Sequence, residues 1–478
     1  MRYHFLRAAA GNTGGGGGGI TPWGWYGSSI VTNPSVTLDP STGDLHLHGG
    51  YRQSALIQGD GSNYTWKRGW TGGNLTSTVN GTMNSSGQGL GILDGRALII
   101  GSTVVTLETN YWSGGGVTLR TWRHLIRNLS NGTISANYIK PYYNVDWEDA
   151  TASTYYSQIG RLAKDSSDNY IVPFYHGQNT VEGYDSSHTK QWTKQYNNMP
   201  YPIARTTTSG NLIPCVSYYY MSPFYLNATT GAITGQQNTI TIAGNTFNSQ
   251  NKSLAGYDSN GHPAWCYGAR NYNSAWRNIL LKYNMSTGAL LQKTSIQYLP
   301  TSTSTSGYAL IDSNDDFYFV MFSDNGSGES GQTTPEYGPK ILKIDSSGSV
   351  VWERVITAGA TTSHTSYVYG FELSDDESVF YIAINSMRDS NNTSRNWVLA
   401  FPTAGTATQL TDGTVTVDFK ALTDGTSRFS VTASDWRVST TSSYVTVSST
   451  GTTSYSPYTA GVAAITDTSQ TLSYTSVS

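Results

Sequence analysis

One stretch, Gly307 to Ile356, constrains the fold more than any other. It contains two runs of alternating apolar residues, GYALIDSNDDFYFVMF and KILKIDSSGSVVWERVI, each interrupted by a cluster of Asp, Ser, Asn or Gly. Alternation with a period of two is typical of strands, and Asp and Gly favour tight turns. Each run therefore predicts a β-hairpin. Two hairpins within about 50 residues predict one four-stranded blade of a β-propeller.

Six further pairs of hairpins repeat this pattern. They lie at 35–68, 91–139, 161–195, 203–236, 252–293 and 369–410. Charged residues make up only 12% of the chain, against about 25% in a typical globular protein, while 51 Gly and 34 Tyr suit turns and strands. No window predicts an amphipathic helix of three turns. The sequence therefore predicts an all-β fold: a seven-bladed β-propeller of four-stranded antiparallel blades.

Two segments flank the predicted propeller at 21–410. Residues 1–20 form a leader in which Gly14–Gly19 would act as a flexible tether, and this leader is either a docking peptide or a frayed terminus. Residues 411–478 form either a separate small β unit or, the favoured interpretation, a C-terminal β extension or arm that completes the ring and packs outside it. Its tail, 466–478, could add a strand to the sheet edge of another chain.

The segments between hairpins vary in length. The longest are 69–88, 237–251 and 322–337. In a propeller such insertions lie on the rims, so we expect partner contacts there.

Few patterns point to catalysis. His46 and His48 alternate on one predicted strand, so they could share a metal ion, but spacing gives no third ligand and the alternative is a surface strand face. The acidic clusters 146–149 and 375–377 could serve a glycosidase as a carboxylate pair. No P-loop, G-x-S-x-G or H-E-x-x-H motif is present. We therefore expect no enzyme activity and no catalytic, metal or cofactor-binding residues.

Two turns resemble the beginning of a calcium loop: 165–169 and 312–316. Both lack the Gly at position six and the Glu at position twelve of an EF-hand. Side-chain-to-backbone turn bonding is the favoured interpretation, with incidental cation binding as the alternative.

Aromatic clusters are the most informative candidates for binding. They comprise Trp23, Trp25, Tyr26, Tyr218, Tyr219, Tyr220 and Tyr225. Exposed Tyr and Trp suit glycan stacking or protein interfaces. The alternative is that these rings fill the space between wide blades.

Charge and targeting signals narrow the function further. The net charge of −3 offers no basic stripe for nucleic acid, and no apolar run is long enough for a signal peptide or a membrane span. Synthesis in the cytoplasm of a host cell is therefore expected. Cys215 and Cys266 are predicted to be buried thiols in strands.

The hairpin sequence Lys343–Trp352, K-I-D-x-x-G-x-V-x-W, resembles the repeats of quinoprotein-like (PQQ-like) β-propellers. Copies at 225–233 and 282–291 fit the same pattern. The resemblance implies the fold over about 35–410. It implies no cofactor, because no set of quinone-binding residues matches.

The leader Phe5–Gly11 with its glycine run resembles the N-termini of structural proteins in tailed bacteriophage particles, as does the Gly/Ser/Thr/Asn/Tyr-rich composition. This resemblance implies a virion structural protein of the tail: a nozzle, baseplate, fibre or appendage component. Other tail proteins would be its partners, in a symmetric homo-oligomer. The alternatives are a host-receptor or carbohydrate-binding protein and, less favoured, a glycan-degrading propeller enzyme.

Overall fold

The structure, a computed structural model, describes most of the chain. The described residues are 20–27, 35–49, 52–72, 75–77, 81–88, 97–114, 117–140, 161–175, 179–203, 207, 210–217, 221–242, 247–272, 275–299, 307–321, 336–362, 364–442, 444, 446–452, 465–470 and 474–478. All regular elements in these ranges are β-strands, and none of the described residues forms a helix able to cross a membrane.

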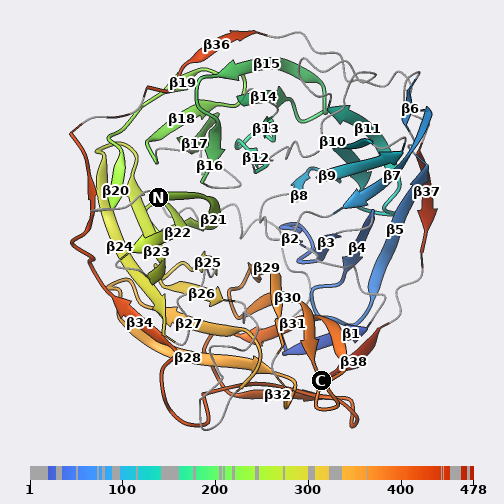
Figure 1. Ribbon diagram of the computed structural model, residues 1–478, viewed down its shortest axis with the longest axis vertical. Helices are drawn as coiled ribbons and strands as arrows, with labels where there is room; N and C mark the ends of the chain where they lie inside the picture. The colour runs from blue at the N-terminus through green and yellow to red at the C-terminus, as the bar shows by residue number, and fades with distance from the viewer. Residues whose placement is uncertain are drawn as a thin grey trace.

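Seven antiparallel sheets stand around a central axis like the blades of a wheel (Figure 1). The prediction of a seven-bladed β-propeller is therefore confirmed. Blade 1 contains β2 (Ser35–Leu38), β3 (Leu45–Gly49), β4 (Gln53–Ile57) and β5 (Tyr64–Gly72). Blade 2 contains β8 (Ala97–Ile100), β9 (Thr103–Gly114), β10 (Val117–Asn128) and β11 (Ile134–Lys140). Blade 3 contains β12 (Ala163–Lys164), β13 (Tyr170–Tyr175), β14 (Asn179–Tyr184) and β15 (Lys190–Tyr196). Blade 4 contains β16 (Pro200–Pro202), β17 (Leu212–Ser217), β18 (Pro223–Asn227) and β19 (Ile233–Thr234). Blade 5 contains β21 (Phe247–Tyr257), β22 (Pro263–Tyr272), β23 (Ala275–Asn284) and β24 (Ala289–Tyr298). Blade 6 contains β25 (Gly307–Ile311), β26 (Phe317–Met321), β27 (Lys340–Ile344) and β28 (Val350–Thr357). Blade 7 contains β29 (Tyr367–Leu373), β30 (Val379–Arg388), β31 (Ser394–Pro402) and β1 (Trp23–Gly27).

Blade 7 closes the ring with a strand from the other end of the chain. Its outer strand is β1, which pairs with β31 from Trp23↔Ala400 to Gly27↔Asn396. The hairpin predicted over 397–410 is therefore wrong, because the chain leaves blade 7 after β31. The physical reason is that an N-terminal strand in the last blade links first and last blades through backbone hydrogen bonds.

The C-terminal segment, residues 408–478, encircles the ring, and we call it the belt. Its strands are β32 (Thr408–Thr411), β33 (Thr416–Lys420), β34 (Phe429–Thr432), β35 (Val438–Thr440), β36 (Ser449–Thr452), β37 (Ile465–Ser469) and β38 (Thr475–Val477). In this order β33 pairs with β28, β34 with β24, β36 with β15, β37 with β5 and β38 with β1. The belt thus visits blades 6, 5, 3, 1 and 7, against the direction in which the blades were built.

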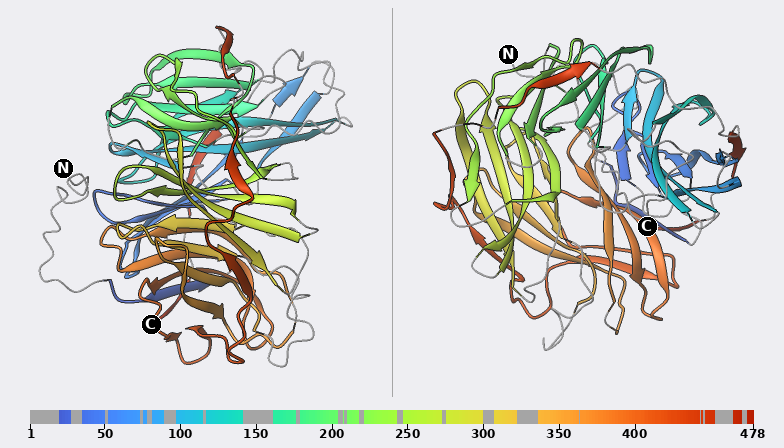
Figure 2. Two further views of the ribbon diagram at one scale, coloured as in Figure 1. Left: turned by 90° about the vertical axis from the view of Figure 1, so that its left-hand side faces the viewer. Right: turned by 45° about the horizontal axis from the view of Figure 1, so that its top comes forward.

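At blade 4 the belt is held differently. Strand β35 pairs with β20 (Ile240–Ile242), just beyond the blade's outer strand. The Gln236 side chain donates to the Val447 carbonyl at 3.1 Å and accepts from its N–H at 2.8 Å, so one amide group makes two strand-like bonds. Figure 2 shows the belt from the side, crossing the outer edges of the blades.

The expectation that the tail adds to another chain is corrected by these pairings. Strands β37 and β38 occupy edges of the same chain, β5 and β1. An outer strand with free N–H and C=O groups can pair with another molecule. Here the belt, which belongs to the same chain, pairs with β5 and β1 and so occupies these groups.

The core is divided among the seams between blades. Seven hydrophobic clusters are found in the described part of the chain, and each joins two neighbouring blades. Strand β26 illustrates the alternation: Phe317 and Phe319 pack toward blade 5, whereas Tyr318 and Val320 pack toward blade 7. Both faces of a blade are therefore buried, as close packing of blades around an axis requires.

Blade 2 departs from the regular plan. Strand β9 pairs with β8 over its first part and with β7 (Gly81–Gln88) over its last part, and β7 in turn pairs with β6 (Leu75–Ser77). Part of the predicted insertion 69–88 is therefore an extension of the blade 2 sheet. Of the other two insertions, 322–335 lies outside the described residues and 240–242 forms β20.

Candidate functional site

A five-residue turn recurs on one rim of the propeller. We call it an inner turn where it connects the first and second strands of a blade, and an outer turn where it connects the third and fourth strands. In each copy the Asp that opens the turn accepts, through Oδ1, the backbone N–H groups two and four residues later, at 2.8–3.0 Å. On this rim the opening residues are Asp165, Asp185, Asp258, Asp312 and Asp345. Asp389, between the second and third strands of blade 7 (β30 and β31), opens the same turn on the opposite rim. The predicted side-chain-to-backbone turn chemistry is therefore observed.

The fourth position of this turn has a left-handed backbone. Gly348 has φ 90°, and Asp168 and Asp315 have φ 64° and 67°. Glycine and, among other residues, Asn and Asp adopt this region at the lowest cost. This explains why the fourth residue is Gly in the turn D-S-S-G-S and Asp in the turn D-S-N-D-D.

Neighbouring inner turns are fastened to one another by acids at this fourth position. Asp315 of blade 6 accepts from Ser259 of blade 5, N–H to Oδ1 at 2.6 Å and hydroxyl to Oδ2 at 3.2 Å. Glu377 of blade 7 accepts from Ser313 of blade 6, with the hydroxyl at 2.6 Å and the N–H at 3.1 Å. The predicted carboxylate cluster 375–377 therefore lies in an inner turn and links blades.

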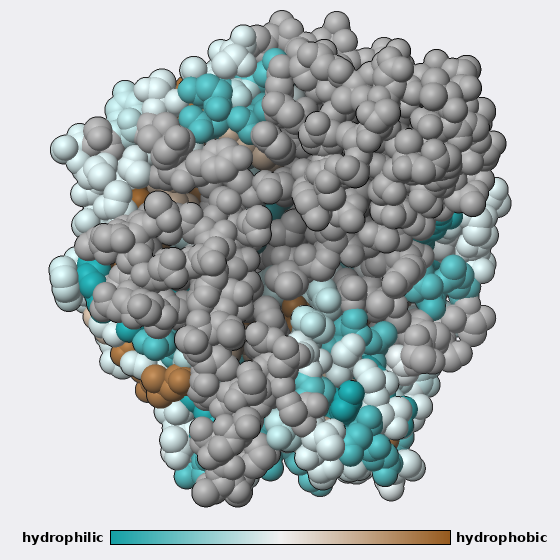
Figure 3. Space-filling model, viewed as in Figure 1, coloured by the Kyte–Doolittle hydropathy of each residue, from teal (hydrophilic) through white to brown (hydrophobic). Residues whose placement is uncertain are grey.

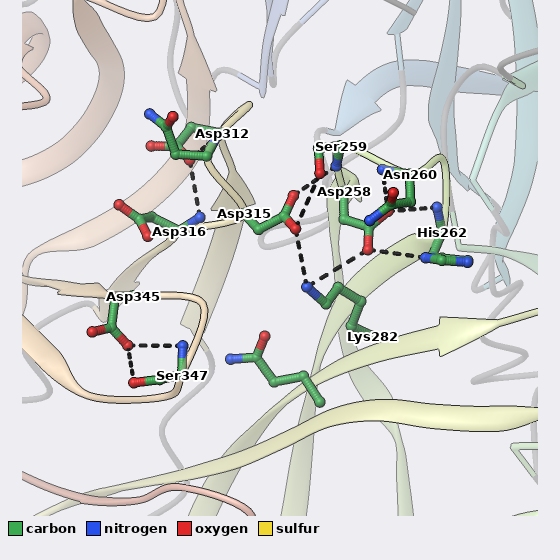
Figure 4. A network of polar contacts seen from close by, with 12 residues as sticks. Asp258, Ser259, Asn260, His262, Lys282, Asp312, Asp315, Asp316, Asp345 and Ser347 are labelled. Carbon is green, nitrogen blue, oxygen red and sulfur yellow. Dashed lines mark hydrogen bonds and ion pairs between the residues drawn. The ribbon is translucent and has the colours of Figure 1, made fainter. Parts of the chain in front are cut away.

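Figure 4 shows the most charged of these links, between blades 5 and 6. The Lys282 ammonium lies 3.6 Å from Oδ2 of Asp258 and 3.5 Å from Oδ2 of Asp315. Lys282 is 8% exposed, so its charge is largely removed from water and is balanced by one carboxylate from each blade. Asp258 also receives His262 Nδ1 at 3.0 Å.

Outer strands lock onto the next blade through tryptophan. Trp66 in β5 packs on Gly132 in the outer turn of blade 2, where a Cβ would lie 2.5 Å from the indole, and its Nε1 donates to the Leu129 carbonyl at 2.6 Å. The same pairing recurs around the ring. Its other members are Trp23 with Gly61, Trp192 with Gly231, and Trp352 with Gly405. Each glycine has a positive φ and no side chain, so only glycine admits the ring.

The belt is anchored by charged groups as well as by strand pairing. Asp467 in β37 accepts from the Arg127 guanidinium at 2.9 Å, and Arg127 is fully buried between blades 1 and 2. Glu336 of blade 6 lies 2.9 Å from the Lys420 ammonium and accepts the Thr423 N–H at 2.9 Å. Burial would raise the pKa of Glu336, but these two partners outweigh it and hold the pKa below its usual value.

The aromatic residues proposed as binding contacts are distributed differently from the prediction. Trp23, Trp25 and Tyr26 lie in β1 and are 5%, 0% and 6% exposed, so the expectation of surface contacts is wrong for them. Trp23 and Trp25 donate to the carbonyls of Gly59 and Gly61 at 3.0 and 2.9 Å. The two indole rings fill the seam between blades 7 and 1, and Tyr26 packs in the cluster between blades 6 and 7, so all three provide the inter-blade filling that was the alternative.

The remaining four tyrosines give no composite site. Tyr218, Tyr219 and Tyr220 lie outside the described residues. Tyr225 in β18 is half-buried against the cluster between blades 4 and 5, and burial raises its pKa. No sequence signal pointed to the most exposed large hydrophobic residue described, Trp436 in the belt, which is 75% exposed.

His46 and His48 share a face, as predicted, but that face is buried rather than on the surface. Their rings are nearly parallel with centroids 6.3 Å apart, and His48 Nδ1 lies 3.2 Å from the Ser54 hydroxyl. Burial first, and the nearby charges of His48 and Arg127 second, hold the pKa of His46 well below its usual value. Within the described ranges no group of three or more His, Cys, Asp or Glu could hold a metal ion.

The two cysteines occupy separate seams. Cys215 in β17 and Cys266 in β22 are buried free thiols, as predicted. Burial raises the pKa of the Cys215 thiol well above its usual value, so this sulfur is held as an unreactive thiol. The acidic cluster 146–149 lies outside the described residues.

No protein-family model matches the chain, and no curated protein matches it in sequence. Solved structures similar to it include BamB from Moraxella catarrhalis, with a TM-score of 0.37 and 10% identity over 77% of this chain and 84% of that one. Another is a protein of unknown function from Bacteroides caccae, with a TM-score of 0.33 and 10% identity over 70% of this chain and 93% of that one. The strand order of the chain itself shows a seven-bladed β-propeller enclosed by its own C-terminal belt.

Proposed function

We propose that this chain is a structural component of a tailed bacteriophage particle, in which the propeller is a rigid platform for protein–protein assembly. The observation that carries the proposal is the belt, which pairs with the outer edges of blades 6, 5, 3, 1 and 7. Each of these five blades can separate from the ring only after the belt strand outside it has detached. Such an arrangement slows unfolding, which suits a part that must persist in a particle outside the cell.

Edge coverage supports the same function. Free outer strands at high local concentration, as in an assembling particle, would pair with one another without specificity. By covering these edges, the belt leaves recognition to side chains and to the extensions between blades, such as β6 and β7 on blade 2. The assignment to a phage tail itself rests on the leader and composition of the sequence.

The decisive experiment is quantitative mass spectrometry of particles purified by density gradient from lysed host cells. We expect peptides of this chain at a fixed ratio to the tail proteins across gradient fractions, and a propeller-shaped density in a particle reconstruction. An enzyme expressed from the same genome provides the negative control, since it should remain in the soluble lysate. Recovery of this chain only in the soluble lysate, together with the control enzyme, would overturn the proposal.

A further inference from the structure

Four exposed apolar side chains lie on the outer strands of blades 5 and 6 and on the belt beside them, and we call them the outer apolar patch. They are Leu291 (45% exposed), Val350 (48%), Val351 (53%) and Trp436 (75%). In the described part of the chain only two other large hydrophobic residues are comparably exposed, Leu299 and Tyr444. Exposed apolar residues scattered singly are normal, whereas a group of them indicates an interaction site.

The three segments that carry these side chains meet at one contact point. A Cβ on Gly348, in the outer turn of blade 6, would lie 2.8 Å from Cβ of Ala433 in the belt and 2.9 Å from Oγ1 of Thr294 in β24. Each patch residue is within three positions of one of these residues, which is about 10 Å of chain. Figure 3 shows hydrophobic surface at the lower left, where Figure 1 places β28 and β34.

The patch is exposed because the belt covers only the later part of each outer strand. Strand β33 pairs with Val355–Thr357 of β28, and β34 pairs with Ser295–Tyr298 of β24. No described belt strand pairs with Val350–Arg354 or with Ala289–Gln292. The beginnings of both strands therefore present backbone edge and apolar side chains together.

The size of the patch selects its occupant. Four side chains of this kind expose on the order of a few hundred Å², which is less than the ~800 Å² that each partner contributes to a standard interface. A second folded copy would therefore bury too little apolar surface here. A short apolar segment tethered to the molecule needs far less, because its effective concentration is in the millimolar range.

The leader has the matching chemistry. Tyr3, Phe5 and Leu6 are apolar, and Arg2 and Arg7 flank them with positive charge. Beside the patch, Asp345 uses Oδ1 for its turn, and its Oδ2 has no partner in the described part of the chain. Hydrogen bonds from the Ser347 hydroxyl and the Ser349 N–H hold the pKa of Asp345 below its usual value, so the carboxylate is charged at neutral pH.

The leader joins the body on the rim that carries the patch. Ile20 donates its N–H to the Ser378 hydroxyl at 3.2 Å, in the inner turn of blade 7. Inner and outer turns are alternate connections of an antiparallel meander, so both kinds lie on one rim. The residues between Arg7 and Ile20 can extend to about 40 Å. Packed sheets lie about 10 Å apart and strands within a blade about 5 Å apart, so this length reaches the outer strands of blades 5 and 6 from the inner turn of blade 7.

We propose that residues 2–7 of the leader bind the outer apolar patch of their own chain, with Phe5 and Leu6 against Val350, Val351 and Trp436. The chain treats its C-terminal segment in the same way, since the belt also binds edges of its own molecule. The proposal goes beyond the platform function and does not depend on a phage origin.

Site-specific photocrosslinking tests this directly. Phe5 is replaced by p-benzoylphenylalanine in the full chain, and the illuminated protein is mapped by mass spectrometry. We expect crosslinks to fall within 289–293, 348–354 and 433–437. An equal mixture of ¹⁴N- and ¹⁵N-labelled protein should give only same-label crosslinks, because the contact is within one chain.

Two substitutions in the body provide the matched comparison. Val350→Thr with Val351→Thr keeps strand-compatible shapes but removes apolar surface, and should lower the crosslink yield at least fivefold. Leu299→Thr, at an exposed residue outside the patch, should leave the yield unchanged. Crosslinks that map elsewhere, that join ¹⁴N to ¹⁵N chains, or that survive the double substitution would each overturn the proposal.

Discussion

Thr411 and Ser478 exchange two backbone hydrogen bonds, with N–O distances of 3.2 and 3.4 Å. They lie near the two ends of the belt, so the belt returns to its own beginning after passing around the ring. The Tyr26 hydroxyl donates to Asp412 at 2.6 Å and fastens this junction to β1. The ring is thus closed twice, by β1 within blade 7 and by the belt outside it.

The ion pair between Asp467 and Arg127 gives the first prediction. Asp467→Asn should lower the free energy of unfolding by about 3 kcal/mol, because it leaves the buried Arg127 charge without its carboxylate. Asp418→Asn, also in the belt, should change it by less than about 0.5 kcal/mol, because the Asp418 carboxylate accepts its hydrogen bond from the exposed Gln409 side chain. Urea denaturation measures both, and equal effects would contradict the assigned role of Asp467.

The tryptophan–glycine contacts give a second prediction from a matched pair of glycines. Gly132 and Gly210 have φ of 70° and 69°, but a Cβ would strike the Trp66 ring only at Gly132, while nothing lies within 4 Å at Gly210. Gly210→Ala should cost about 1 kcal/mol of stability from backbone strain alone. Gly132→Ala should cost at least about 2 kcal/mol, because the displaced indole adds to the strain. Similar losses of thermal stability in the two variants would show that the ring does not pack as tightly as described.

A third prediction concerns acid. Burial holds the pKa of His46 below its usual value, so the unfolded chain binds this proton first and stability begins to fall below about pH 6.5. Burial would raise the pKa of Asp389, but Arg395 and two backbone N–H groups outweigh it and lower the pKa. The stability that such turn carboxylates contribute is full above about pH 4 and is lost as pH falls through their folded pKa values.

The melting temperature should therefore fall in two steps between pH 7 and pH 2.5. His46→Gln should make the first step smaller and Asp389→Asn the second, each without altering the other; His188 and His364, whose pKa values burial also lowers, account for the remainder of the first step. A melting temperature that stays constant down to pH 4 would show that His46 does not titrate in the unfolding equilibrium as its burial implies.

The blades could be predicted because their signals are local. Asp312 and Asp345 open turns whose bonds reach only four residues ahead, and Gly348 stands where the turn needs a positive φ. Alternating residues such as Phe317–Met321 mark the strands on either side. Every part of this pattern is present within a short window of sequence.

Packing of 411–478 outside the ring is expected from the sequence, but the strand that closes blade 7 and the partners of the belt strands could not be predicted, because these partners are distant in sequence. Trp23 and Trp25 look like surface aromatic residues until β31 and β38 are placed on either side of β1. Asp467 stands in a polar segment with no distinguishing motif, and its importance comes from Arg127, which is 340 residues away. Pairings of this kind depend on the closed ring and leave no periodic trace of their own.

The belt makes a final prediction about kinetics. Removing residues 465–478 deletes β37 and β38, exposes the edges of β5 and β1, and separates Arg127 from Asp467. If each blade is released only after its belt strand has detached, the truncated chain should unfold at least tenfold faster in urea. A tenfold increase requires that the truncation destabilise the native state by about 1.4 kcal/mol relative to the transition state of unfolding. Stopped-flow fluorescence measures the rate, and a chain lacking only 475–478 is the graded control, with an intermediate rate expected. If both truncations unfolded at the rate of the full chain, the belt strands would already be detached in the transition state of ordinary unfolding, and the belt could not be what makes the ring persist.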